Sequence, residues 1–256
     1  MLVLRERHGH TEVLTLNRPE AANSLNPPLM DELGLALQQI LDDVDARAVV
    51  VTGAGDRVFC AGMDLSSLGG WDDQGPGNDR PGAAALADFM GGTYPKPLIA
   101  AVNGAAVGGG LELVMACDLV VACDRARFGL PEVKRGLYAA GGGTLLSTRI
   151  PQALALEIGL TGRLIGADRA ERHGLVNQVV PSADLVTTAI ALADEVAANG
   201  PLAVQLTKRL MRGAVARGEA AGLATPEENS SIFGSEDARE GATAFMEKRT
   251  ATFVGR

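Results

Sequence analysis

Three apolar runs constrain the fold of this chain more than any other feature of its sequence. They are RAVVVTGAG (47–55), PLIAAVNG (97–104) and DLVVACD (118–124). Short continuous apolar runs that end at turn residues are typical of strands buried on both faces of a parallel sheet. Helical patterns lie between these runs, so we expect the first two thirds of the chain to form repeated strand–helix units, an α/β core.

The segments around these runs follow other patterns. Residues 2–7 and 12–17 alternate between apolar and polar positions, which predicts an opening hairpin with its turn at HGH. A helical stripe of apolar residues begins after Pro28. The segment 66–82 is rich in Gly, Asp and Pro, so we expect a surface loop there, of the kind that often borders a binding site.

The last part of the chain changes character after about residue 182. Helical patterns then follow one another directly, over 182–198, 201–213 and 236–249. The dipeptide GP at 200–201 separates the first of these patterns from the second. We therefore expect a C-terminal region in which helix packs on helix.

Composition excludes several classes of function. The chain is 46% hydrophobic and carries a net charge of −8, which argues against nucleic-acid and membrane-surface binders. No signal-peptide core and no apolar run of about 20 residues is present, so a cytoplasmic protein is expected. The three cysteines, Cys60, Cys117 and Cys123, have no paired spacing and are expected to be small core residues, with neither a disulfide nor a metal site.

Several familiar catalytic motifs are missing, among them the nucleophile elbow, the phosphate-binding loop and the zinc-binding HExxH. His8, His10 and His173 lie outside every candidate site. Carboxylates are therefore better candidates than imidazoles for acid–base chemistry. Three segments remain, namely FCAGMDL (59–65), NGAAVGGGLEL (103–113) and FGLPEVKRG (128–136).

The middle segment carries three consecutive glycines and then one carboxylate in an apolar run. Glycines at a helix entrance let the backbone approach a ligand closely and leave N–H groups unpaired. Together with the helix dipole, these N–H groups favour negative charge. Glu112 is then either part of an active site or a favourable charge at a helix start. Glu132, which follows Pro131, is open to the same two interpretations.

Other polar and glycine positions favour structural roles. Asp64 is expected to cap or orient its loop, and Asp118 is expected to be a turn residue rather than a catalyst. The second glycine cluster, Gly141–Gly143, is either another close-approach loop or a helix entrance.

Taken in order, these segments resemble the crotonase superfamily, the enoyl-CoA hydratase/isomerase family, and most of all an enoyl-CoA hydratase. The resemblance covers nearly the whole chain. It runs from LNRPEAANSLN through FCAGMDL, KPLIAAVNGAAVGGGLELVMACDLVVA, ARFGLPEVKRG and ERHGLVNQVV to SEDAREGATAFMEKR.

This resemblance implies an α/β, crotonase-like fold of repeated β-β-α units that form a spiral core, followed by a helical trimerisation region. Residues 1–195 would form the core with the CoA site and active site, and 196–256 the helical region for oligomerisation. It also implies a homotrimer or a dimer of trimers, an acyl-CoA substrate with a place in fatty-acid β-oxidation, and no cofactor beyond the coenzyme A of the substrate.

The resemblance assigns roles to individual residues. The backbone N–H groups of Met63 and Gly109 would form an oxyanion hole. Glu112 would help activate water, and Glu132 would exchange the proton at the α-carbon. Further substrate or CoA contacts are implied for Ala22, Ala61, Gly62, Asp64, Leu65, Gly108, Ala140, Gly141 and Lys248.

Two departures from the family pattern stand out. Hydratases commonly carry Pro-Gly where this chain has Ala139 and Ala140, in the loop that helps place the reacting water. The residue after RP is basic in some relatives, near the nucleotide of CoA, and here it is Glu20.

Because both glutamates are present, the leading prediction is addition of water to a trans-2-enoyl-CoA. The alternatives are a Δ3,Δ2-enoyl-CoA isomerase, another acyl-CoA lyase or hydrolase, and a non-catalytic acyl-CoA-binding protein. The acyl-chain length is not predicted, because the variable 66–92 region builds the pocket wall.

Overall fold

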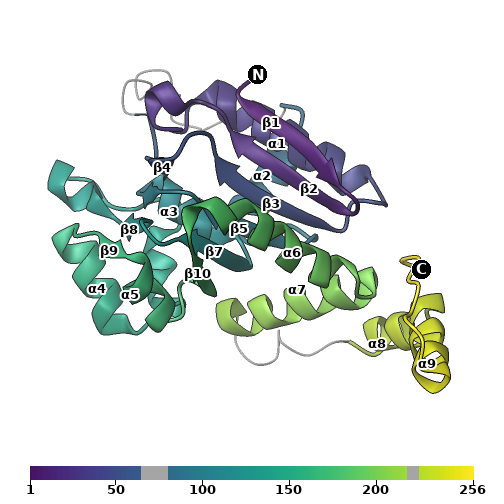
Figure 1. The fold of residues 1–256 in the computed structure, drawn as a ribbon. Coiled ribbons are helices and arrows are strands. Elements are labelled where there is room, and N and C mark those ends of the chain that lie inside the picture. The colour runs from purple at the N-terminus through teal and green to yellow at the C-terminus, as the bar shows by residue number, and fades with distance from the viewer. Residues whose placement is uncertain (65–79, 218–224) are drawn as a thin grey trace.

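A six-stranded sheet forms the centre of the molecule (Figure 1). The computed structural model describes residues 1–64, 80–217 and 225–256. In spatial order the strands are β1 (Val3–His8), β2 (Thr11–Leu16), β3 (Ala48–Gly53), β5 (Leu98–Val102), β7 (Leu119–Cys123) and β10 (Gln178–Val180). Strands β1 and β2 are antiparallel, and every later pairing is parallel.

The three apolar runs are the neighbouring strands β3, β5 and β7, and they are buried almost throughout. The predicted α/β core is thereby confirmed. The opening hairpin is also present, although its strands begin one residue later and one residue earlier than the pattern predicted.

A second sheet of four short strands continues from the first. It consists of β4 (Val58–Cys60), β6 (Ala105–Val107), β8 (Arg127–Gly129) and β9 (Ile165–Gly166). Strands β3, β5 and β7 of the large sheet are each followed by a short strand, and β6 leads directly into helix α3 (Gly109–Ala116). This repeated succession of two strands and a helix is the β-β-α unit that the resemblance implied.

Helices cover the sheets and extend beyond them. The core carries α1 (Pro27–Asp42), α2 (Ala83–Met90), α4 (Gln152–Thr161), α5 (Ala167–Arg172) and α6 (Leu185–Ala197). Short 3-10 turns lie at η1 (Pro19–Ala21), η3 (Pro131–Arg135), η4 (Gly143–Thr148) and η5 (Ser182–Asp184). The C-terminal helices are α7 (Pro201–Arg217), α8 (Pro226–Phe233) and α9 (Glu236–Glu247), and α8 and α9 lie away from the sheets in Figure 1.

Helix α1 illustrates how local sequence determines these elements. The Asn26 side chain accepts a hydrogen bond from the Leu29 N–H at 3.1 Å, which satisfies one N–H at the helix start. Leu29, Leu33 and Leu37 are completely buried, as the predicted stripe requires. Helix α8 was not predicted, and its start carries a capping box formed by Thr225 and Glu228. The predicted loop at 66–82 lies mostly outside the described residues.

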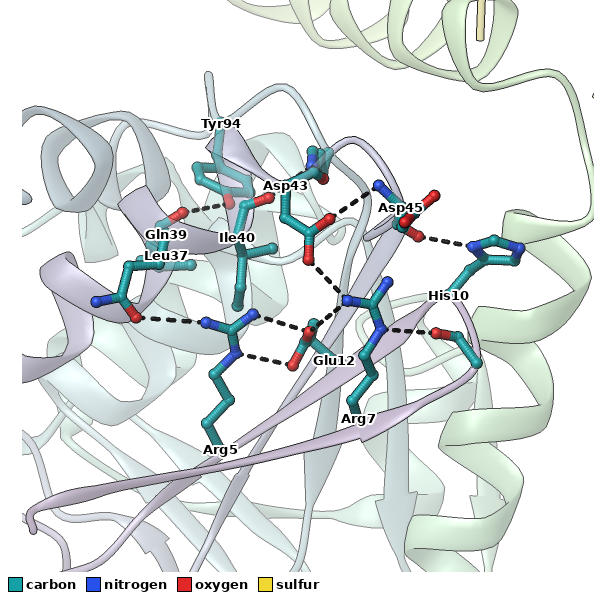
Figure 2. A network of polar contacts seen from close by, with 12 residues as sticks. Arg5, Arg7, His10, Glu12, Leu37, Gln39, Ile40, Asp43, Asp45 and Tyr94 are labelled. Atoms are coloured by element: carbon teal, nitrogen blue, oxygen red, sulfur yellow. Dashed lines mark hydrogen bonds and ion pairs between the residues drawn. The ribbon is translucent and has the colours of Figure 1, made fainter. Parts of the chain in front are cut away.

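Charged side chains join the opening hairpin to α1 (Figure 2). The Glu12 side chain is only 1% exposed, and Arg5 binds both of its oxygens at 2.9 Å. Arg7 reaches Asp43, just after α1, at 2.7 Å. Lys96 donates to the carbonyl oxygens of Ile40 and Asp43, both at 2.6 Å. These bonds compensate the burial of Glu12 and Lys96, which would otherwise be costly.

A second ionic cluster joins the C-terminal region to the core. Asp118, in the turn between α3 and β7, binds Arg212 Nε and Lys208 Nζ of α7, each at 2.7 Å. The Leu98 N–H also donates to this carboxylate, at 2.8 Å. Asp118 is thus a turn residue, as expected, and it also anchors α7. Helix α6 runs across the predicted boundary at residue 195 and packs on the large sheet, and the division into two regions stays a prediction.

No helix in the described ranges is both long and apolar enough to cross a membrane.

The Asp118 cluster leads to a prediction about stability. Asp118→Asn leaves Lys208, whose side chain is 9% exposed, without its counter-charge. Removing one partner of a buried ion pair costs about 3 kcal/mol or more. Chemical denaturation should show a loss of this size in the free energy of unfolding.

The matched control is Asp31→Asn, which breaks an exposed pair with Arg80. Exposed pairs are worth at most about 1 kcal/mol. Equal losses in the two variants would contradict the anchoring role of Asp118.

Candidate active site

The three segments singled out in the sequence meet at one edge of the small sheet. Strands β4, β6 and β8 are parallel neighbours, so their carboxyl ends lie side by side. Met63 follows β4, the glycines 108–110 follow β6, and Glu132 follows β8. The topology therefore brings these residues together at the edge where ligands bind in parallel sheets.

Glycine is required at this edge because two backbones touch. A Cβ atom at Gly62 would lie 2.8 Å from the Gly109 nitrogen, and one at Gly110 would lie 2.0 Å from the Cys60 carbonyl oxygen. Gly62 and Gly108 also have φ angles of +88° and +58°, which side chains disfavour. The conformational cost of these glycines is explained by the close approach of α3 to the segment after β4.

Two backbone N–H groups at this contact have no partner among the residues that the structure describes. Leu25 forms a parallel bridge with Met63, in which it donates to the Gly62 oxygen and accepts from the Asp64 N–H, both at 2.8 Å. The Met63 N–H therefore points away from Leu25. Gly109 is the first residue of α3, so its N–H has no helical partner. Within the described ranges neither N–H donates a hydrogen bond. Such a pair of donors can hold an oxygen that carries negative charge.

Glu112 lies in the first turn of α3 and is 9% exposed. The Gly143 N–H donates to its Oε1 at 2.8 Å, and the Gly141 backbone lies close to the same carboxylate. Burial raises the pKa of Glu112 above its ordinary value, the Gly143 N–H opposes this, and the negative charge of Glu132 adds to the rise. A carboxylate with a raised pKa accepts protons more readily than an ordinary one, as a general base requires.

Glu132 stands over the glycine turn from the other side. A Cβ atom at Gly108 would lie 3.0 Å from its Oε1, so the carboxylate lies directly against the start of α3. Its Oε2 is buried, and in the described part of the chain it has no hydrogen-bond partner. A buried oxygen without a partner needs an explanation, and a bound substrate or water is one. The two glutamates thus lie near each other beside two N–H groups that have no partner in the described ranges.

The cluster Gly141–Gly143 is both a close-approach loop and a helix entrance, the two roles that the sequence left open. Gly143 begins η4, and Gly141 approaches Glu112 so closely that a Cβ would lie 2.4 Å from Oε2. Ala139 is buried under this loop, while Ala140 is exposed at its rim. Sequence reasoning singled out the glycine cluster but not the bond from Gly143 to Glu112, and it did not identify Leu25, because both act through contacts that only the tertiary fold creates.

The remaining predicted contacts have different positions. Ala22 accepts a hydrogen bond from the Ala61 N–H at 3.1 Å, so these two residues are adjacent. Asp64 binds Arg18 at 3.1 Å, which agrees with its expected orienting role. Leu65 lies outside the described residues. Lys248 follows α9, far from α3 in Figure 1, so a single chain does not bring it to the other residues.

No cluster of three or more potential metal ligands occurs among the residues that the structure describes.

Comparison with known proteins supports one family throughout. A family model described as enoyl-CoA hydratase/isomerase matches residues 6–256. An enoyl-CoA hydratase of Mycobacterium tuberculosis is 41% identical over 261 residues, covering 99% of this chain and 96% of that protein. An (E)-benzylidenesuccinyl-CoA hydratase of Thauera aromatica is 37% identical, and the match covers all of both chains.

Solved structures give the same result. The crystal structure of an enoyl-CoA hydratase from Bacillus anthracis matches with a TM-score of 0.90 at 35% identity, covering all of both chains. That of an enoyl-CoA hydratase from Mycobacterium tuberculosis matches with a TM-score of 0.88 at 40% identity, covering 100% of this chain and 99% of the other.

The burial of Glu112 leads to a prediction about stability and pH. A carboxyl group whose pKa is raised by folding stays protonated in the folded chain over a pH range in which the unfolded chain has lost the proton. The wild type should therefore lose stability relative to Glu112→Gln as the pH rises from about 4. The difference in unfolding free energy between the two proteins should level off above the pKa of Glu112 in the folded chain. Its size should be about 1.4 kcal/mol for each unit by which folding raises that pKa.

Chemical denaturation of both proteins across this pH range measures the difference. Glu227→Gln, at an exposed position on α8, is the control and should show no such trend. A difference between wild type and Glu112→Gln that does not change with pH would contradict the raised pKa.

Proposed function

The chain is an enzyme of the enoyl-CoA hydratase/isomerase family, and from this premise we propose that it adds water across the 2,3 double bond of a trans-2-enoyl-CoA to give a 3-hydroxyacyl-CoA. The observation that carries the proposal is the pair of carboxylates, Glu112 and Glu132, beside two unpaired backbone N–H groups. Several relatives are named enoyl-CoA hydratases, which supports the same reaction.

The first part of the mechanism is stabilisation of negative charge. The N–H groups of Met63 and Gly109 bind the carbonyl oxygen of the thioester. This oxygen gains negative charge as the double bond is attacked, and donors fixed in advance are each worth roughly 2.7–4 kcal/mol. Since both donors belong to the backbone, the methionine side chain at position 63 does not interfere with this role.

The second part is the transfer of protons. The Glu112 carboxylate accepts a proton from water as the water oxygen bonds to C3. Glu132, which carries a proton when the substrate is bound, delivers it to C2 on the same face. After the product leaves, the proton on Glu112 is lost to solvent and Glu132 regains one, so the cycle adds one water in total. Because burial raises its pKa, the ionised carboxylate of Glu112 is a stronger proton acceptor than an ordinary glutamate. Coenzyme A enters as part of the substrate, and no other cofactor takes part.

The loop with Ala139 and Ala140 still supports this mechanism. Glu112 receives its hydrogen bond from the backbone of Gly143, so the alanines need not supply a polar group. The absence of Pro-Gly is nevertheless the specific observation that favours a second candidate, a Δ3,Δ2-enoyl-CoA isomerase. A 3-enoyl-CoA turned over much faster than its 2-enoyl counterpart would favour that reaction over hydration.

The proposal includes a homotrimer or a dimer of trimers in the cytoplasm. Large apolar side chains are exposed around η4 and α4, at Tyr138, Leu145 and Leu160, and on the C-terminal helices, at Phe233 and Met246. Exposed apolar groups of this kind are typical of surfaces covered by another subunit. Lys248 would then approach the nucleotide part of CoA in a neighbouring subunit.

Sedimentation velocity tests the assembly. A trimer or hexamer is the expected result, and Lys248→Ala should raise the KM for enoyl-CoA in the intact assembly with little change in kcat. A monomeric, fully active enzyme would contradict this part of the proposal.

Direct assay of hydration tests the reaction. Loss of the absorbance of crotonyl-CoA should be catalysed by the wild type, and Glu112→Gln and Glu132→Gln should each lower kcat by roughly 10²–10⁴-fold, because each removes a proton-transfer group. Glu227→Gln serves as the matched control and should retain wild-type activity. Full activity in both active-site variants would exclude the mechanism.

A further inference from the structure

We propose that Arg149 is a positioning residue for Glu112, which acts by anchoring η4, the segment whose first residue holds the Glu112 carboxylate. The proposal rests on the proposed function in taking Glu112 as the proton acceptor. Nothing in the motifs or the family resemblance singled out this arginine, which immediately follows η4.

The geometry shows η4 bound to α3 at two places, in its first turn and at its C-terminal end. In the first turn the Gly143 N–H donates to Glu112 Oε1 at 2.8 Å. At the C-terminal end Arg149 Nη1 donates to the Met115 carbonyl oxygen at 2.8 Å and to that of Cys117 at 3.4 Å. Met115 and Cys117 lie three and five residues beyond Glu112, so the two attachments are roughly 5–8 Å apart along the helix axis. Segment η4 is therefore bound along the C-terminal half of the active-site helix, from Glu112 to Cys117.

The arginine satisfies backbone groups that the helix cannot satisfy by itself. The last carbonyl groups of a helix lack partners within it. Arg149 donates to the carbonyl oxygens of Met115 and Cys117, while Arg212 of α7 donates to the Ala116 carbonyl oxygen at 2.8 Å. Positive charge is also favoured at this end of a helix. Unlike Arg212, Arg149 has no carboxylate partner among the described residues, so its bonds serve α3 alone.

The glycine loop needs such an anchor. Gly141, Gly142 and Gly143 precede the anchored part of η4, and glycine has little conformational preference of its own. Gly142 has a φ of +110°. The position of the Gly143 N–H is therefore set by residues further along η4 and just after it, namely the buried side chain of Leu146 and the guanidinium of Arg149. Releasing Arg149 frees the far end of η4 and loosens the bond to Glu112.

The test compares Arg149→Met with Arg212→Met. Both variants remove an arginine from the end of α3, but only the first releases η4. We expect Arg149→Met to lower kcat by roughly tenfold to a hundredfold with KM nearly unchanged. In a plot of kcat against pH, the fall in kcat on the acid side (the acid limb) should move to higher pH. The reason is that Glu112 loses a hydrogen bond that lowers its pKa. Amide hydrogen exchange over 141–148 should be faster than in the wild type. Arg149→Lys, which keeps the positive charge, should restore part of the wild-type value in each measurement.

Arg212→Met should lose at least as much thermal stability, because it also loses the pair with Asp118, and should keep the wild-type acid limb. An acid limb that stays in place in Arg149→Met, or that moves equally in both variants, would overturn the proposal. If Arg149→Met does not fold, Arg149→Gln, whose shorter side chain also lacks the guanidinium, is judged by the same outcomes.

A readout independent of turnover separates this proposal from the proposed function. Infrared titration of the Glu112 carboxyl, identified by its loss in Glu112→Gln, measures its pKa without substrate. A wild type inactive on every enoyl-CoA would reject hydration alone. An unchanged Glu112 titration in Arg149→Met would reject the anchoring role alone.

Discussion

Gly110 of α3 packs against the Cys60 carbonyl oxygen so closely that a Cβ atom there would lie 2.0 Å from it. The rest of the site depends on this contact between a helix and the strand β4. It brings the start of α3 beside the segment that follows β4, which places the Met63 and Gly109 N–H groups next to each other. It also directs Glu112, in the first turn of α3, toward the loop at Gly141–Gly143.

The site combines two opposing electrostatic demands. Glu112 is buried enough for its pKa to be raised, yet backbone N–H groups stabilise its ionised form. Beside it, Glu132 has a buried oxygen with no partner among the described residues, which is unfavourable unless a ligand occupies the site. Groups held in unfavourable surroundings are typical of active sites, where function is retained at the expense of stability.

Sequence reasoning predicted the features that local pattern encodes. The apolar runs predicted β3, β5 and β7, and the glycines with Glu112 indicated a close-approach site at a helix start. The bond from Gly143 to Glu112 and the anchor at Arg149 joined residues 31 and 34 positions apart, so no local pattern indicated them. Helix α8 was missed because it is short and largely polar. The roles of Met63 and Lys248 came from family resemblance alone.

Incubation of crotonyl-CoA with the enzyme in deuterium oxide enriched in heavy oxygen tests the central claim most directly. If Glu112 activates water and Glu132 delivers the proton, mass spectrometry will find one heavy oxygen at C3 and one deuterium at C2 of the 3-hydroxyacyl product. A product that carries deuterium but no heavy oxygen would contradict hydration.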